Sequence, residues 1–119
     1  MASPLGAGED DVVEMANLQE KYTGIPGVVF ISTQMGSHGP RVKYFLKAGR
    51  DQPSFSVAIF DPPKLIANSL PERDLNRFAP LVIRWVALNQ GELLRFWEDG
   101  NSWSVDEVGA FANRLKKLT

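Results

Sequence analysis

His38 has the widest chemical capacity of any side chain in this sequence, because imidazole titrates near neutral pH. It is the only histidine, and it lies in a short segment, residues 36–40, that contains two glycines and a proline. A histidine in such a loop can serve as a general base, serve as a pH switch, or only hydrogen-bond a neighbouring backbone group. The first role needs a carboxylate brought close by folding, for which Asp61 and Asp99 are the candidates.

Basic residues follow this loop. Arg41, Lys43 and Lys47 alternate with apolar residues in the segment 41–48, and Phe45 stands among them. Cations about 7 Å apart along one strand face can follow a phosphate backbone while the aromatic ring stacks on a base. The alternative is an ordinary solvated sheet face, where lysines also protect an exposed edge from aggregation.

Composition narrows the remaining chemistry. The chain has no cysteine and one histidine, and its carboxylates form no cluster in the sequence, so we expect neither a metal nor another cofactor. No nucleophile-elbow motif accompanies the serines. The 13 basic and 14 acidic residues nearly balance. Binding to nucleic acid or to another partner would therefore have to be local, because the whole protein exerts no strong field.

The 119 residues have ordinary globular composition, with 44% hydrophobic and 23% charged residues. Residues 1–8 lack periodicity and predict a flexible tail, and residues 9–119 predict one domain. No window is apolar for long enough to cross a membrane, and the N-terminus lacks the pattern of a secretory signal. We therefore expect a soluble cytoplasmic protein without membrane contact.

The first half of the chain predicts one helix and then strands. Spacing from Asp10 to Tyr22 indicates a helix that Gly24 stops. Three strands are expected after it, and a fourth at the sheet edge. Their ranges are 28–31, buried on both faces, then 41–48 and 55–60, with 64–67 as the edge strand.

The second half predicts helices. An apolar stripe with helical period begins near Leu70, and Pro80 inside it predicts a kink or two helices meeting near Ala79. Ser104 and Glu107 form a capping-box pattern at the start of a terminal helix. Together these segments predict an α+β fold, in which a small antiparallel sheet of three to four strands packs against two or three helices, with an N-terminal helix.

The three tryptophans divide between core and surface. Trp97 falls on the apolar stripe, and Trp103 pairs with Val108 as a hydrophobic staple. Trp85 lies away from the main stripe, and we expect it to contact a partner. A subunit that acts only inside an oligomer, through Trp85 or the N-terminal helix, is therefore one functional alternative.

From Val28 to Trp97 the chain resembles a family of small bacterial proteins of unknown function associated with toxin-antitoxin type operons. The shared features are the His38-Gly39-Pro40 loop, the alternating strand after it, Leu70-Pro71 at a helix start, Trp85, and Glu92-Leu93-Leu94 before Trp97. Family members carry alternating histidines on the second strand, where this chain has Arg41 and Lys43. The resemblance implies no established activity, and it favours binding or regulation over catalysis.

The sequence therefore predicts a non-enzymatic binding module that contacts a protein partner or nucleic acid. Its expected recognition surface consists of His38, Arg41, Lys43, Phe45 and Lys47. The enzymatic alternative uses His38 with one of the two candidate carboxylates.

Overall fold

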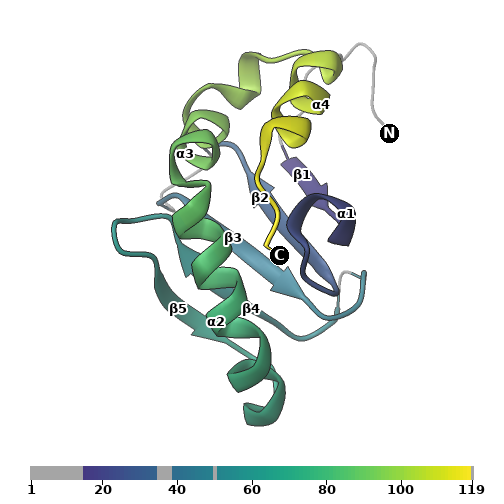
Figure 1. The fold of residues 1–119 in the computed structure, drawn as a ribbon, viewed down its shortest axis with the longest axis vertical. Coiled ribbons are helices and arrows are strands. Elements are labelled where there is room, and N and C mark those ends of the chain that lie inside the picture. Colours follow the sequence, from purple (N-terminus) through teal and green to yellow (C-terminus); the bar gives the residue numbers. More distant parts are fainter. Residues whose placement is uncertain (1–14, 35–38, 50, 119) are drawn as a thin grey trace.

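The computed structural model describes residues 15–34, 39–49 and 51–118. Five antiparallel strands form one sheet whose spatial order follows the chain order (Figure 1). Neighbouring strands join through connections too short for a crossover helix, which makes antiparallel pairing the economical solution. The strands are β1 (Met15–Leu18), β2 (Val28–Ser32), β3 (Arg41–Phe45), β4 (Ser54–Ala58) and β5 (Lys64–Asn68).

The described helices lie on one side of this sheet (Figure 1). A short helix, α1 (Glu20–Thr23), connects β1 to β2, and the longer helices follow β5. This segregation of strands and helices confirms the predicted α+β class. The sheet has five strands, one more than the upper end of the predicted three to four. The later helical elements are α2 (Glu72–Leu88), α3 (Gln90–Asp99), the 3₁₀ turn η2 (Gly100–Ser102) and α4 (Val105–Arg114).

The predicted N-terminal helix from Asp10 to Tyr22 is not confirmed: only its last residues, 20–22, are helical, in the short α1, among the residues that the structure describes. Residues 10–14 lie outside them, and Met15–Leu18 forms a strand paired with β2. Leu18 opposes Val29, so pairing with β2 places it in the core. Residues 15–18 form a strand because the edge of β2 offers them backbone hydrogen bonds. The spacing of apolar residues within the segment carries no information about that edge. The stop at Gly24 is confirmed, because this residue has a left-handed φ of 77°.

One core fills the space between the sheet and the helices. Strands β2 and β3 alternate buried and half-buried residues, and the buried set points toward the helices. Tyr44 is fully buried, and its ring stacks on Phe55 at 5.0 Å and on Phe78 of α2 at 5.4 Å between centroids. Aromatic packing therefore links the middle of the sheet directly to α2.

The helix break falls at Asn89 and not near Ala79. Pro80 lies inside α2, which runs without interruption to Leu88. Pro80 is exposed, so water can satisfy the backbone carbonyl that loses its partner in the preceding turn. Asn89 is buried, and its φ of −118° separates α2 from α3.

The terminal helix begins as predicted. The Ser104 hydroxyl accepts a hydrogen bond from the Glu107 backbone N–H at 3.2 Å, and the Glu107 carboxylate accepts one from the Ser104 N–H at 2.9 Å. Trp103 and Val108 are partly buried and pack against the core. These contacts confirm the capping box and fix the direction in which α4 leaves the turn.

Trp85 is not a surface residue, and its predicted role as a partner contact is wrong. Its side chain is fully buried in the core formed by the sheet and helices. Trp85 stands seven residues after Phe78 and three after Val82, so the helix places all three side chains on its buried face. None of the described helices combines the length and apolarity needed to cross a bilayer.

Candidate binding surface on the open sheet face

The sheet face opposite the core carries no helix from the described part of the chain. Alternation along the strands sends every second side chain to this side, and the pairing register identifies which ones. We call this surface the open face. It is formed by Asn17, Val28, Phe30, Ser32, Arg41, Lys43, Phe45, Ser54, Ser56, Ala58, Lys64 and Ala67. The small side chains of Ser56 and Ala58 are buried among their larger neighbours.

Aromatic and basic side chains are neighbours at the centre of the open face. Phe30 on β2 pairs with Lys43 on β3, and Val28 pairs with Phe45. Lys43 is therefore about 5 Å from Phe30 across the strands and about 7 Å from Phe45 along β3, measured between backbone positions. Both rings and the lysine are partly exposed, so all three groups are accessible to a ligand.

A hollow of about 630 Å³ lies over this centre. Its walls combine apolar surface from β2 and β3 with polar side chains from the neighbouring β1 segment. The residues around it are Asn17, Gln19, Val28, Phe30, Lys43, Phe45, Ala48 and Gly49. A concave, largely apolar site with a few polar groups is the usual form of a ligand-binding surface.

Gly27 allows β2 and β3 to approach each other at one end of the hollow. Its φ is 107°, and an added Cβ would lie 2.6 Å from both the Phe45 carbonyl oxygen and the Tyr44 hydroxyl. The Tyr44 hydroxyl donates a hydrogen bond to the Pro26 carbonyl, and burial raises the pKa of Tyr44 to about 12. The residues before β2 are thus held close to the end of β3, where Phe45 stands.

The five strands carry cations and no acidic residue. Arg41, Lys43 and Lys64 are the charged residues in the strands, and the register places all three on the open face. Arg41 and Lys64 both pair with Ala58, one from each side of β4. The described acidic residues belong to helices, turns and loops. The charged strand residues of the open face are therefore all basic, although the whole chain has a net charge of −1.

The structure places the sequence-predicted residues in different ways. Arg41, Lys43 and Phe45 share the open face, and two of them, Lys43 and Phe45, line the hollow. Lys47 lies beyond the end of β3 and is exposed, because the strand stops at Phe45 and does not continue to Ala48 as predicted. His38 lies outside the described residues.

The two candidate carboxylate partners of His38 lie in separate parts of the fold. Asp61 is exposed in the turn between β4 and β5, and Asp99 is exposed at the end of α3. The backbone on either side of residues 35–38 is hydrogen-bonded to α3, which ends at Asp99, and to the segment that follows β4 and leads to Asp61. Gln34 donates its N–H to the Trp97 carbonyl at 2.7 Å, and the Pro40 carbonyl accepts from the Ile59 N–H at 2.9 Å.

Sequence reasoning missed Phe30, Asn17 and Lys64 as surface residues. Strand 28–31 was predicted to be buried on both faces, whereas Val28 and Phe30 are only half-buried. A continuous apolar run hides the alternation, and only the neighbouring strands reveal which side lacks a cover. One indication for Lys64 is present in the sequence, because it predicts an edge strand over residues 64–67 and an edge strand is partly exposed.

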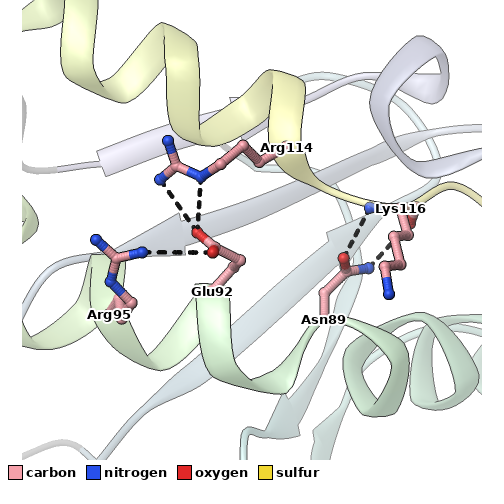
Figure 2. Close-up of polar contacts among 5 residues, drawn as sticks. All are labelled: Asn89, Glu92, Arg95, Arg114 and Lys116. Atoms are coloured by element: carbon pink, nitrogen blue, oxygen red, sulfur yellow. Dashed lines mark hydrogen bonds and ion pairs between the residues drawn. The ribbon is translucent and has the colours of Figure 1, made fainter.

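A second group of polar contacts lies among the helices and serves packing (Figure 2). The Glu92 carboxylate bridges Arg95 at 3.4 Å and Arg114 at 3.1 Å, which connects α3 to α4. Asn89 binds the main chain of Lys116. Across the described ranges, no three histidine or acidic side chains gather in a way that could hold a metal ion.

Comparisons with known proteins return no matching family model, no matching curated protein and no matching solved structure. The resemblance of residues 28–97 to operon-associated proteins therefore remains a prediction from the sequence.

Proposed function

We propose that this protein is a non-enzymatic binding module whose recognition surface is the open face. The observation that carries the proposal is the grouping of Phe30, Phe45 and Lys43 around the hollow, on a sheet face without a described cover. A partly exposed phenylalanine gains stability only when another surface covers it, because apolar area in water is unfavourable. A partner that docks there would supply this cover.

The polar groups of the open face support recognition. Arg41 and Lys43 form no ion pair with another described residue, so their charges stay available to a ligand. The amide side chains of Asn17 and Gln19 can donate and accept hydrogen bonds at the edge of the hollow. Cations, amides and aromatic rings are groups that bind and orient a partner.

The proposed role is regulatory, through contact with a protein partner or nucleic acid. This part of the proposal is supported by the resemblance of residues 28–97 to operon-associated bacterial proteins. The open face coincides with the segment that carries the resemblance most clearly, since β2 and β3 flank the His38-Gly39-Pro40 loop.

The test is an affinity capture from the native host with three forms of the tagged protein. The open-face variant is Arg41→Gln/Lys43→Gln. The matched control, Lys116→Gln/Lys117→Gln, removes the same charge from exposed residues beyond α4. We expect a species that wild type and control retain and the open-face variant loses, and that rebinds wild type after purification. Equal retention by all three forms would overturn the proposal.

A further inference from the structure

The basic residues of the open face favour a negatively charged ligand. Arg41, Lys43 and Lys64 lie on it, and the five strands contain no acidic residue to neutralise them. The chain as a whole has a net charge of −1, so this basic surface is a local feature. A ligand that gains from these cations must itself carry negative charge along its length.

The two aromatic rings select flat groups within that ligand. Phe30 and Phe45 stand on adjacent strands and line one hollow, with Lys43 next to both. A phosphate backbone that follows Lys43 brings its bases to the level of these rings. Bases of a single strand can leave their stack and pack on aromatic side chains, whereas bases inside a duplex cannot.

The amides beside the rings fit the edges of such bases. Asn17 pairs with Phe30 across β1 and β2, and Gln19 lines the same hollow. An amide side chain has both a donor and an acceptor, which matches the mixed hydrogen-bonding edge of a nucleobase. An acidic peptide would also meet the cations, and its backbone groups could pair with the two amides. It offers a flat ring only at an aromatic residue, whereas every nucleotide of a single strand carries one.

We propose that the open face binds single-stranded nucleic acid, with phosphates on Arg41 and Lys43 and bases stacked on Phe30 and Phe45. The inference rests on the proposed function, because it names the occupant of the same surface. RNA and DNA single strands share this chemistry, and the experiment separates them.

Fluorescence anisotropy with end-labelled 12-nucleotide single strands of mixed sequence tests the inference. The probes are one RNA, one DNA and the matched DNA duplex. Wild type binds at least one single strand more tightly than the duplex. Phe30→Leu and Phe45→Leu each keep apolar bulk and lose the flat ring, and each weakens the affinity roughly 5- to 150-fold.

The salt dependence tests the cations separately. Arg41→Gln/Lys43→Gln removes two phosphate contacts, and the negative slope of log affinity against log salt becomes shallower by about 1.4. Lys116→Gln/Lys117→Gln keeps the wild-type slope. Affinity that falls equally in both charge variants, or that is unchanged in both phenylalanine variants, would mean general attraction to polyanions and would overturn the inference.

A measurement on wild type alone covers the case in which a variant fails to fold. In an NMR titration with the single strand, the side-chain amide signals of Asn17 and Gln19 shift, whereas that of the exposed Asn113 on α4 does not. Unchanged signals from Asn17 and Gln19 at saturating single strand would overturn the inference.

Failure of the inference is distinguishable from failure of the proposed function. A captured protein that depends on Arg41 and Lys43, with no oligonucleotide binding at low salt, overturns the nucleic-acid inference and leaves the binding module standing. Absence of any captured species together with absence of oligonucleotide binding overturns both.

Discussion

The amide of Asn89 binds the main chain of Lys116 through both of its polar atoms (Figure 2). Nδ2 donates to the Lys116 carbonyl at 2.9 Å, and Oδ1 accepts from the Lys116 N–H at 2.8 Å. Nδ2 also donates to the Trp85 carbonyl at 3.0 Å. One buried side chain therefore connects the junction of α2 and α3 to the segment that follows α4.

Replacing this amide destabilises the fold. Asn89→Ala leaves the Lys116 carbonyl and the Lys116 N–H without their partner, while the Trp85 carbonyl keeps the bond from the backbone N–H of residue 89. We expect the free energy of unfolding to fall by about 1–3 kcal/mol. Urea unfolding followed by tryptophan fluorescence measures the change. The exposed Asn113→Ala in α4 should change stability by less than about 0.5 kcal/mol. Equal effects of the two substitutions would contradict the role assigned to Asn89.

The bridge formed by Glu92 contributes much less. Its arginine partners have side chains 57% and 45% exposed, so water and salt screen both ion pairs. Glu92→Gln should lower the free energy of unfolding by no more than about 1 kcal/mol at low salt, and by almost nothing at 1 M NaCl. The control is the exposed Glu98→Gln in the same helix. A loss for Glu92→Gln that persists at high salt would refute this interpretation.

Gly27 should tolerate no side chain. Gly27→Ala places a Cβ at a φ of 107° and within 2.6 Å of the Phe45 carbonyl oxygen, and we expect a loss of about 1–3 kcal/mol in stability. Gly109→Ala is the matched control. An added Cβ there meets nothing within 4 Å, and helix propensity predicts a gain of about 0.5–1 kcal/mol. Thermal unfolding of both variants decides the point, and a neutral Gly27→Ala would contradict it.

Tyr44 should make stability fall with pH in the alkaline range. Burial raises its pKa from 10.0 to about 12 in the folded protein, so between these values the unfolded state releases a proton that the folded state keeps. Unfolding is therefore favoured as pH rises, by up to about 1.4 kcal/mol per pH unit between pH 10 and 12.

The Tyr44→Phe variant isolates this effect from other alkaline titrations. It lacks the hydrogen bond to the Pro26 carbonyl and should be less stable than wild type at pH 8. The stability difference between the two proteins should shrink as pH rises through 10 to 11. Urea midpoints at pH 8, 9, 10 and 11 measure it, with Tyr22→Phe as the control. A difference that stays constant would rule out the assigned shift.

The prediction of the helical half succeeded where a local pattern carries its own physical cause. Ser104 and Glu107 satisfy each other's backbone groups within one turn, so the sequence signature and the structure are the same interaction. Pro80 shows the limit of such reasoning. Its cost depends on exposure. Asn76 and Arg84, four residues to either side, are also exposed, but their spacing indicates an outward face only if the helix continues through Pro80.

The candidate site was predicted only as far as it depends on residues close together in the sequence. Period-two alternation correctly placed Arg41 and Lys43 on one side of β3 and Tyr44 on the other. It could not identify Phe30 as their neighbour, because that contact depends on the register of β2 against β3. Register is set by turn geometry and by which faces are buried, and a single strand's sequence contains neither.

By itself, the sequence determined the α+β class, the alternation of β3 and the capped start of α4, because each depends on residues a few positions apart. Only the tertiary structure decided that residues 15–18 form a strand and which sheet face stays open. These outcomes depend on contacts between segments distant in sequence, such as Leu18 with Val29. Burial is a property of the assembled core, so local spacing cannot specify it.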